Sequence, residues 1–341
     1  MSNVTVTKDF NGDFSVEIRR TIKNGYESMT PIVEDGVQWE TDRQGSPGKL
    51  TFKVYKDKNG NLEFQEGDKV IFKYKDPSDG WIVLFVGYVF TKRRSKDGWI
   101  EVVAYDHLRY LKNKDTYIYT NKKASDIVKM IANDYELPIG TIESTNYVIG
   151  SRVEDDQTCF DVIQNALDLT LISTTKLYIL YTENGKLCLR DANNLKINIV
   201  INDQVAEDFE YTSSIDENTY NDIELYYDNN ETNKREHFHA TDKTNMGKWG
   251  RLRYTESIQN PANAKDRVKQ MLKLYNRKNR SLKVKKAFGN YKCKAGASVI
   301  VQLDLGDIDV SNYMLIEKAT HTFKRDEYRM DLTLGGTTEF A

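Results

Sequence analysis

The sequence has little of several features that would indicate a covalent framework, a metal site or a membrane segment. Among 341 residues there are 3 cysteines, 4 histidines and 5 prolines. Cys159, Cys188 and Cys293 are far apart and form no CxxC pair, which argues against disulfides or a zinc site and fits a reducing cytosol. No run of about 18 apolar residues exists, so we expect no transmembrane helix. The first ten residues also lack the apolar segment of a secretory signal.

The chain also lacks a charge excess of one sign and the short motifs of common enzymes. Its 49 Lys and Arg face 51 Asp and Glu, a net charge of −2, so the whole-chain charge does not favour a nucleic-acid partner. No P-loop or GxSxG pattern is present, and Gly247 and Gly250 do not make GxGxxG. Support for a nucleotide, dinucleotide or serine-hydrolase site is therefore missing.

Strand-forming residues are abundant. The chain has 21 Tyr and 13 Phe, and apolar side chains alternate along short segments bounded by turn signals. In residues 1–111 such segments occur at 14–18, 50–54, 70–74, 81–91 and 99–105. Because no helical pattern interrupts them, residues 1–111 predict an N-terminal β-barrel.

Residues 112–200 have a different pattern. Apolar residues at helical spacing predict helices at 122–135 and 158–169. Thr158 is placed to cap the second helix, with Asp161 three residues later. Strand patterns follow at 176–182 and 187–190. This segment predicts an inserted α/β domain.

Residues 201–341 return to strand patterns with a helical excursion at about 242–280. Asn260 and Pro261 favour a helix start, and apolar residues from Ala264 to Tyr275 form a stripe that we expect to be buried against a sheet. We interpret this part as a second β-barrel. The expected fold class is α+β, mainly β: two similar small β-barrel domains with an inserted α/β domain and one long helix in the C-terminal part.

Three strand segments recur at a nearly constant spacing, which predicts an internal duplication. The pairs, offset by 229, 230 and 230 residues, are Gln65–Phe72 with Lys294–Val301, Leu84–Val89 with Met314–Ala319, and Trp99–Val103 with Arg329–Thr333. If the repeat is real, Val70 should match Val299, and Val102 should match Leu332.

Blocks along nearly the whole chain carry a family resemblance. They are Trp39–Leu50, Glu66–Asp68, Leu84–Gly87, Glu217–Leu225, Ala240–Asp242, Lys248–Leu252, Gly289, Ala295–Gly296 and His321. The chain resembles the baseplate hub proteins of contractile phage tails, defective prophage particles and R-type bacteriocins. Glu217–Asn221 departs slightly from that family's Asp-Ser-Tyr-Asn-like block, so that strand is assigned less securely.

The resemblance implies a structural protein and not an enzyme, with no catalytic residue, cofactor or metal. It implies a homotrimer that joins a six-fold tail tube to a three-fold spike, with other baseplate proteins and a tape-measure protein as further partners. Such a protein is made in the bacterial cytoplasm and becomes part of a tail baseplate, without a membrane anchor. Two similar barrels per chain would give a trimer six similar units, which would match the symmetry of the tube.

Two residue clusters admit an enzymatic interpretation. His237 and His239 share a strand face near Asp242 and could bind a metal, but a third and fourth ligand are not evident. Glu154–Asp156 could serve a cell-wall hydrolase, yet acids just before a helix commonly stabilise its start. For both clusters the structural interpretation is favoured.

Charge is segregated in the C-terminal third. Residues 265–294 hold 12 Lys or Arg and one acid, whereas residues 201–236 hold 11 Asp or Glu and two basic residues. The candidate interface residues are Arg277, Lys278, Arg280, Lys283, Lys285 and Lys286. Three interpretations stay open: solvated faces paired within one domain, a contact with a neighbouring subunit or the tail tube, and a nucleic-acid-binding module.

Overall fold

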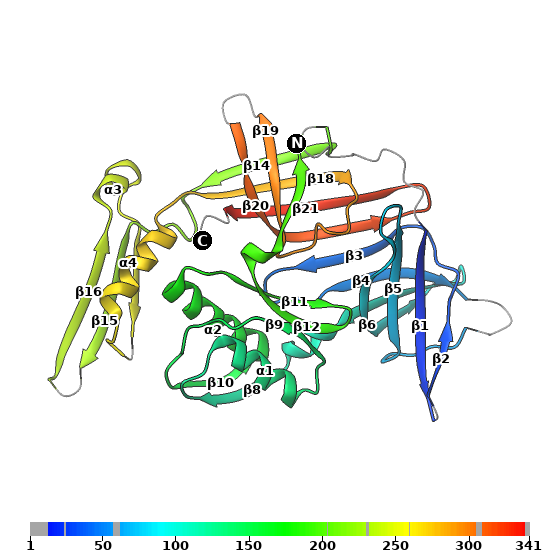
Figure 1. Ribbon diagram of the computed structural model, residues 1–341, viewed down its shortest axis with the longest axis horizontal. Coiled ribbons are helices and arrows are strands. Elements are labelled where there is room, and N and C mark those ends of the chain that lie inside the picture. Colours follow the sequence, from blue (N-terminus) through cyan, green and yellow to red (C-terminus); the bar gives the residue numbers. More distant parts are fainter. Residues whose placement is uncertain are drawn as a thin grey trace.

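The computed structural model describes residues 13–23, 25–56, 62–202, 204–229, 232–258, 260–304 and 309–337. These residues form a mainly β molecule with one large sheet of 13 strands and three small sheets. In Figure 1 the large sheet crosses the upper and right parts, an α/β unit lies below it, and a small sheet with two helices stands apart at the left.

The first half of the large sheet comes from the N-terminal third. Its strands are β1 (Phe14–Ile22), β2 (Gly25–Met29), β3 (Val37–Asp42), β4 (Lys49–Tyr55), β5 (Lys69–Asp76), β6 (Gly80–Arg94) and β7 (Trp99–Asp106). They lie in the order β3-β4-β7-β6-β5-β1-β2. Alternate side chains such as Leu50, Val70 and Val102 are fully buried, as the two-residue period of a half-buried strand requires.

The second half of the sheet comes from the C-terminal part. Its strands are β13 (Lys196–Ile201), β14 (Asp208–Ser214), β18 (Asn279–Phe288), β19 (Ser298–Asp304), β20 (Asp309–Phe323) and β21 (Tyr328–Thr337). The order is β14-β18-β21-β20, with β19 beside β20 and β13 parallel to β19. Leu282, Val299 and Leu332 belong to its separate apolar core.

One strand pair joins the two halves, and it changes the expected architecture. β3 pairs antiparallel with the last part of β20, from Lys318–Asp42 to Phe323–Val37. The strand order is an open path, so the described strands form no closed barrel. The two barrels expected at 1–111 and 201–341 are instead two half-sheets of one continuous sheet. Sequence pattern could not show this, because it identifies strands but not their partners across more than 200 residues.

The inserted α/β unit lies under this sheet. Its elements are η1 (His107–Lys112), β8 (Lys114–Tyr119), α1 (Ala124–Asp134), β9 (Ile139–Ile142), β10 (Arg152–Thr158), α2 (Cys159–Thr174), β11 (Tyr178–Glu183), β12 (Lys186–Asp191) and η2 (Ala192–Leu195). Both expected helices are present, and the Thr158 hydroxyl accepts the Asp161 N–H at 3.1 Å as the cap. The three cysteines are free and buried.

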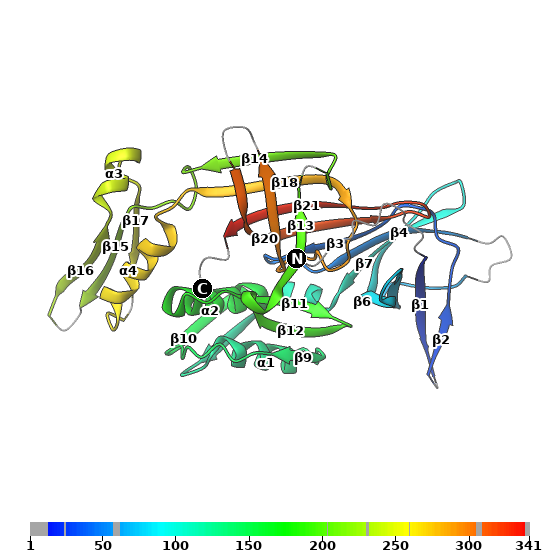
Figure 2. The same ribbon diagram turned by 45° about the horizontal axis from the view of Figure 1, so that its top comes forward.

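The helical excursion is a larger unit than the sequence indicated. β15 (Asp222–Asn229), β16 (Lys234–Thr241) and β17 (Arg253–Ser257) pair only with one another in the described chain. α3 (Lys243–Trp249) and α4 (Ala264–Tyr275) complete the unit, which stands away from the large sheet (Figure 2). Ala264, Val268 and Met271 are buried against the β15–β16 sheet, whereas Leu272 is only partly buried. None of the described helices is long and apolar enough to cross a bilayer.

Candidate functional site

The same tight turn introduces one strand in each half of the sheet. Gly67 has φ +89° and Gly296 has φ +88°, a region that glycine adopts without strain. The Gly67 N–H donates to the Val89 carbonyl, and the Gly296 N–H donates to the Ile316 carbonyl, both at 2.8 Å. In each case the following residue closes the turn by donating to the carbonyl three residues earlier.

A β-bulge also recurs at the equivalent place. In the first half the register shifts between Val89 and Thr91 opposite β7. In the second half it shifts between Ile316 and Lys318 opposite β21. The middle strands therefore correspond at an offset of 227 residues, and the sequence alignment at 230 was wrong by three. The outer strands keep the expected offsets, because the turn glycines differ by 229 and the bulge partners Ala104 and Leu334 by 230.

The joint between the halves is well packed. The Trp39 and His321 rings stack at 5.0 Å, and the imidazole is fully buried. His321 Nε2 lies 3.0 Å from the Cys293 carbonyl oxygen, and the Tyr328 hydroxyl lies 2.9 Å from Nδ1. A carbonyl can only accept, so Nε2 carries the proton and Nδ1 accepts from Tyr328. Burial lowers the His321 pKa to about 4, so the ring is neutral near pH 7.

Three of the candidate interface lysines lie on one exposed edge of the second half. Lys283 and Lys285 point away from the core, because Leu282 and Val284 between them are buried. Each lysine has an acidic partner in the same chain. The pairs are Lys283–Glu210 at 3.3 Å, Lys285–Asp208 at 2.9 Å and Lys286–Glu207 at 3.0 Å.

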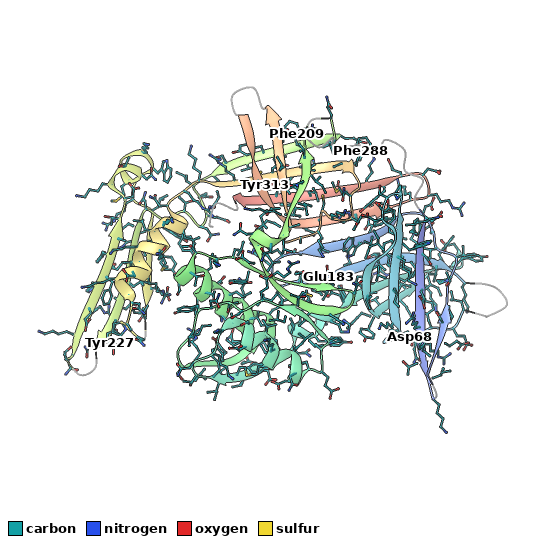
Figure 3. All side chains as sticks on the ribbon, viewed as in Figure 1. Asp68, Glu183, Phe209, Tyr227, Phe288 and Tyr313 are labelled. Atoms are coloured by element: carbon teal, nitrogen blue, oxygen red, sulfur yellow. The ribbon has the colours of Figure 1, made fainter. Side chains whose placement is uncertain are left out.

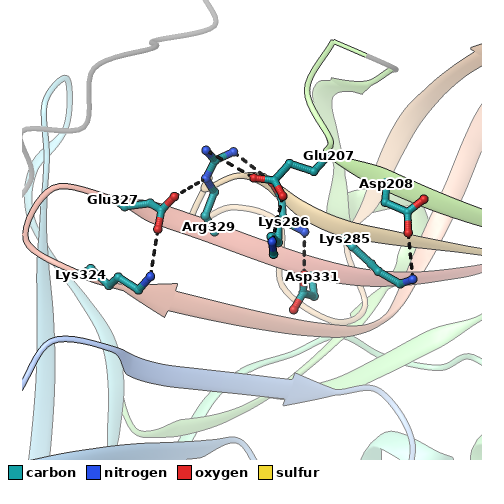
Figure 4. Close-up of polar contacts among 8 residues, drawn as sticks. All are labelled: Glu207, Asp208, Lys285, Lys286, Lys324, Glu327, Arg329 and Asp331. Atoms are coloured by element: carbon teal, nitrogen blue, oxygen red, sulfur yellow. Dashed lines mark hydrogen bonds and ion pairs between the residues drawn. The ribbon is translucent and has the colours of Figure 1, made fainter.

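Figure 4 shows how this charged network continues across β18 and β21. The Lys286 N–H donates to Asp331, and Glu327 pairs with both Lys324 and Arg329. All these groups are at least partly exposed, so each pair contributes only about 0–1 kcal/mol. The acidic and basic stretches thus meet within the chain, while any contact with another subunit stays a prediction.

The other three interface candidates lie where α4 leads into β18. Burial lowers the pKa of Arg277 to about 10, so this residue is not a free surface cation. Lys278 and Arg280 are exposed, and within the described residues neither forms an ion pair.

The two strand histidines meet a carboxylate that the sequence interpretation missed. On β16, His237 Nδ1 and His239 Nε2 lie 2.9 and 3.0 Å from Glu224 Oε1 of β15. Asp242, the expected partner, instead caps α3 through the Thr244 and Asn245 N–H groups. Burial works to raise the Glu224 pKa, but the His237 hydrogen bond and nearby positive charges, including Arg253, outweigh it and lower the pKa. Because Arg253 already compensates this carboxylate, the cluster is sufficiently explained as an ion-pair network.

The acidic run Glu154–Asp156 belongs to β10 and does not cap α2 as expected. Glu154 is buried and accepts from Tyr119, Arg152 and Asn165 at 3.0–3.3 Å. Asp155 accepts from the Thr116 hydroxyl, and Asp156 pairs with Lys114. These partners come from β8 and α2, so the run holds the insertion together, and the structural interpretation accounts for it.

Comparison with known proteins places the chain. Residues 37–335 match the YQBQ-like family. The chain belongs to this family. The protein YqbQ of Bacillus subtilis (strain 168) is 31% identical over 88% of this chain and 91% of its own length. The protein XkdQ of the phage-like element PBSX, from the same organism, is 29% identical over 88% and 92%.

A solved structure shares the fold of this YQBQ-like chain. The 43 kDa tail protein of prophage MuSo2 from Shewanella oneidensis superposes with a TM-score of 0.66 over 96% of this chain and 99% of the other. At 12% identity the likeness concerns the fold. The family match spans both half-sheets, the joint and the insertion, so the whole architecture is common to these proteins.

The sequence interpretation missed one further feature of this YQBQ-like protein. A groove of about 350 Å³ opens beside the last turn-ward part of β6, lined by residues that include Phe64, Lys92, Arg94 and Ile100. The Lys92 ammonium donates to the Phe64 carbonyl and lies over the Phe64 ring. The basic run Lys92–Arg94 at a strand end was the available signal, since charge on an edge strand limits which partner can pair with it.

Proposed function

We propose that this chain is a structural baseplate subunit of a phage tail or tail-like contractile particle. The observation that carries the proposal is the repeated turn and bulge in two half-sheets, within a family that includes a protein of the phage-like element PBSX. The fold likeness to a prophage tail protein supports the same role. A duplicated sheet without a described catalytic cluster suits a scaffold, because repeated strands create repeated contact surfaces.

Within the baseplate, we propose that the chain acts as a hub that forms a homotrimeric ring. Each chain contributes two equivalent half-sheets, so three chains would present six similar units around one axis. A six-fold tail tube could then contact six similar surfaces on one side, and a three-fold spike could contact three chains on the other. The separate β15–β17 unit and the insertion are equivalent only once per chain and would suit three-fold partners, including other baseplate proteins and a tape-measure protein.

The basic candidates Lys278, Arg280, Lys283, Lys285 and Lys286, with the half-buried Arg277, would contribute to recognition at this ring. Electrostatic complementarity selects orientation and partner more than it adds affinity. The in-chain acids beside Lys283, Lys285 and Lys286 make a mixed-charge face, which suits a protein partner better than the phosphate backbone of a nucleic acid.

Genetic removal tests the proposal most simply. Deleting the coding region in a strain that produces particles should abolish complete tails, and a plasmid copy should restore them. Particles purified from the complemented strain should carry the chain at the end of the tail tube, where antibody labelling can locate it by electron microscopy. Complete tails in the deletion strain, or label along the whole tube, would contradict the proposal.

A further inference from the structure

Two strand edges in the large sheet lack a partner in the part of the chain that the structure describes. β14 is the terminal strand of the path and pairs only with β18. Beyond Val89, the end of β6 at Thr91–Arg94 pairs only with β7. Resting on the proposed assembly, we infer that β14 of one chain pairs antiparallel with Thr91–Arg94 of β6 in a second copy of this chain.

The joint inside one chain provides the template for this contact. The bulge makes β6 equivalent to β20, since Thr91 corresponds to Lys318. On the other side, β4 and β18 pair alike with β7 and β21, so Leu50 corresponds to Leu282. β3 and β14 are then equivalent.

The ladders fix the residue correspondence of these outer strands. Trp39 pairs with Leu50, and Tyr211 pairs with Leu282, so Tyr211 takes the place of Trp39. Within the chain, β3 occupies the free edge of β20. The corresponding edge of β6 has no such strand among the described residues, and β14 is the strand equivalent to β3.

The register of the contact follows directly. Trp39 lies opposite His321 in the chain, so Tyr211 would lie opposite Arg94 of the second copy. The groove beside β6 is lined by Arg94, Lys92 and Phe64, and it would receive the Tyr211 ring. A guanidinium against an aromatic face is attractive, and the Trp39–His321 stack at 5.0 Å shows that ring contact at the equivalent place in the joint.

Charge favours pairing between unlike edges. β14 and the residue before it carry Glu207, Asp208 and Glu210, whereas the β6 end carries Lys92, Arg93 and Arg94. Two β14 edges or two β6 edges would place like charges opposite each other, which is unfavourable. Arg93, whose side chain is 77% exposed, would lie opposite Thr212 and diagonal to Glu210. Lys318 and Glu40 form the same diagonal pair at 3.7 Å within the joint.

The two edges cannot meet within one chain. Six strands, β18, β21, β20, β3, β4 and β7, lie between them in the sheet. In Figure 3, Phe209 of β14 is at the upper edge of the molecule, while Asp68, which precedes β5 and hydrogen-bonds Val89 of β6, is at the lower right. Such head-to-tail contacts between unlike surfaces close into a ring when the rotation permits.

Cysteine cross-linking tests the register in the full chain. The Arg43 N–H donates to the Glu317 carbonyl at 2.9 Å, and hydrogen-bonded pairs alternate along an antiparallel ladder. Glu40 and Thr320 therefore form a non-hydrogen-bonded pair, where Cα atoms approach to about 4.5 Å and a disulfide fits. Its equivalent across two chains is Thr212 with Arg93. The natural cysteines are buried and should not compete.

We expect a mixture of the single variants R93C and T212C to give a reducible covalent dimer on oxidation, absent when either is oxidised alone. The double variant R93C/T212C should give covalent trimers. The matched control R93C/S213C moves one thiol to the opposite sheet face and should give at least several-fold less product. If light scattering shows oligomers but R93C/T212C gives no more cross-link than R93C/S213C, the edge pairing is wrong and the proposed assembly role stands. A chain that stays monomeric up to millimolar concentration and inside assembled particles overturns both.

Discussion

Acidification should weaken the joint between the two half-sheets, because the joint contains a buried neutral histidine. His321 is fully buried, and burial lowers its pKa from 6.5 to about 4. In the unfolded chain the same ring titrates near 6.5, so the unfolded state binds more protons between pH 6.5 and 4. Stability from this residue is therefore complete above pH 6.5 and is lost progressively as the pH falls towards 4.

The size of the effect follows from the two pKa values. A gap of about 2.5 pKa units corresponds to about 3 kcal/mol in the free energy of unfolding at about 1.4 kcal/mol per unit. Other groups titrate as well. Burial raises the pKa of the Asp106 carboxyl to about 7, so its contribution is lost as the pH rises, opposite to that of His321. A comparison with a variant that lacks only the histidine cancels these shared terms.

The H321Q variant provides this comparison, because a glutamine amide can still donate to the Cys293 carbonyl. Urea unfolding at pH 7.5, 6.5, 5.5 and 4.5 should show the wild-type advantage shrinking by up to about 3 kcal/mol as the pH falls. NMR titration of the wild-type chain should show one histidine that stays neutral down to about pH 5. A wild-type advantage that is flat with pH, or four histidines that all titrate near 6.5, would refute the reasoning.

Three further predictions test packing, the repeated turn and the charged face. Met271 is buried against β15 and β16 and Leu272 is partly exposed, so Met271→Ala should cost about 2–5 kcal/mol in unfolding free energy and Leu272→Ala clearly less; equal costs would contradict the packing. Gly67 and Gly296 share a positive φ, but an added Cβ meets nothing at Gly67 and lies 2.3 Å from Ile179 at Gly296, so Gly67→Ala should cost about 1–3 kcal/mol and Gly296→Ala more, with the reverse order in thermal unfolding counting against the geometry. Reversing Lys283, Lys285 and Lys286 together to Glu should leave the chain folded by circular dichroism and block particle assembly, whereas intact particles carrying all three changes would show that the face is merely solvated.

Much of the local structure was predictable, because it depends on neighbours in sequence. Alternating apolar residues located the strands, and helical spacing located α1, α2 and α4. The Thr158 cap followed from side-chain chemistry alone. The burial of Val70 and Val299, and of Val102 and Leu332, follows the same alternation at matching positions of the two halves.

Long-range pairing was not predictable in the same way. A bulge adds one residue without leaving a composition signal, so nothing in the sequence marked Phe90 and Glu317 or the three-residue correction that they impose on β6 and β20. The β15–β16 hairpin has the same alternation as the strands of the large sheet, so pattern alone assigned it to the wrong sheet. Glu224 was missed for a related reason, since its histidine partners are 13 and 15 residues away on the next strand.

The central claim is that two equivalent half-sheets per chain build a ring, and electron microscopy of the assembled protein tests it most directly. Class averages viewed along the axis should show a closed ring of three chains with a central opening. Six similar β features should alternate around it, and the β15–β17 unit should appear three times. A ring with another number of chains, or three chains that present only three similar sheet features, would contradict the account.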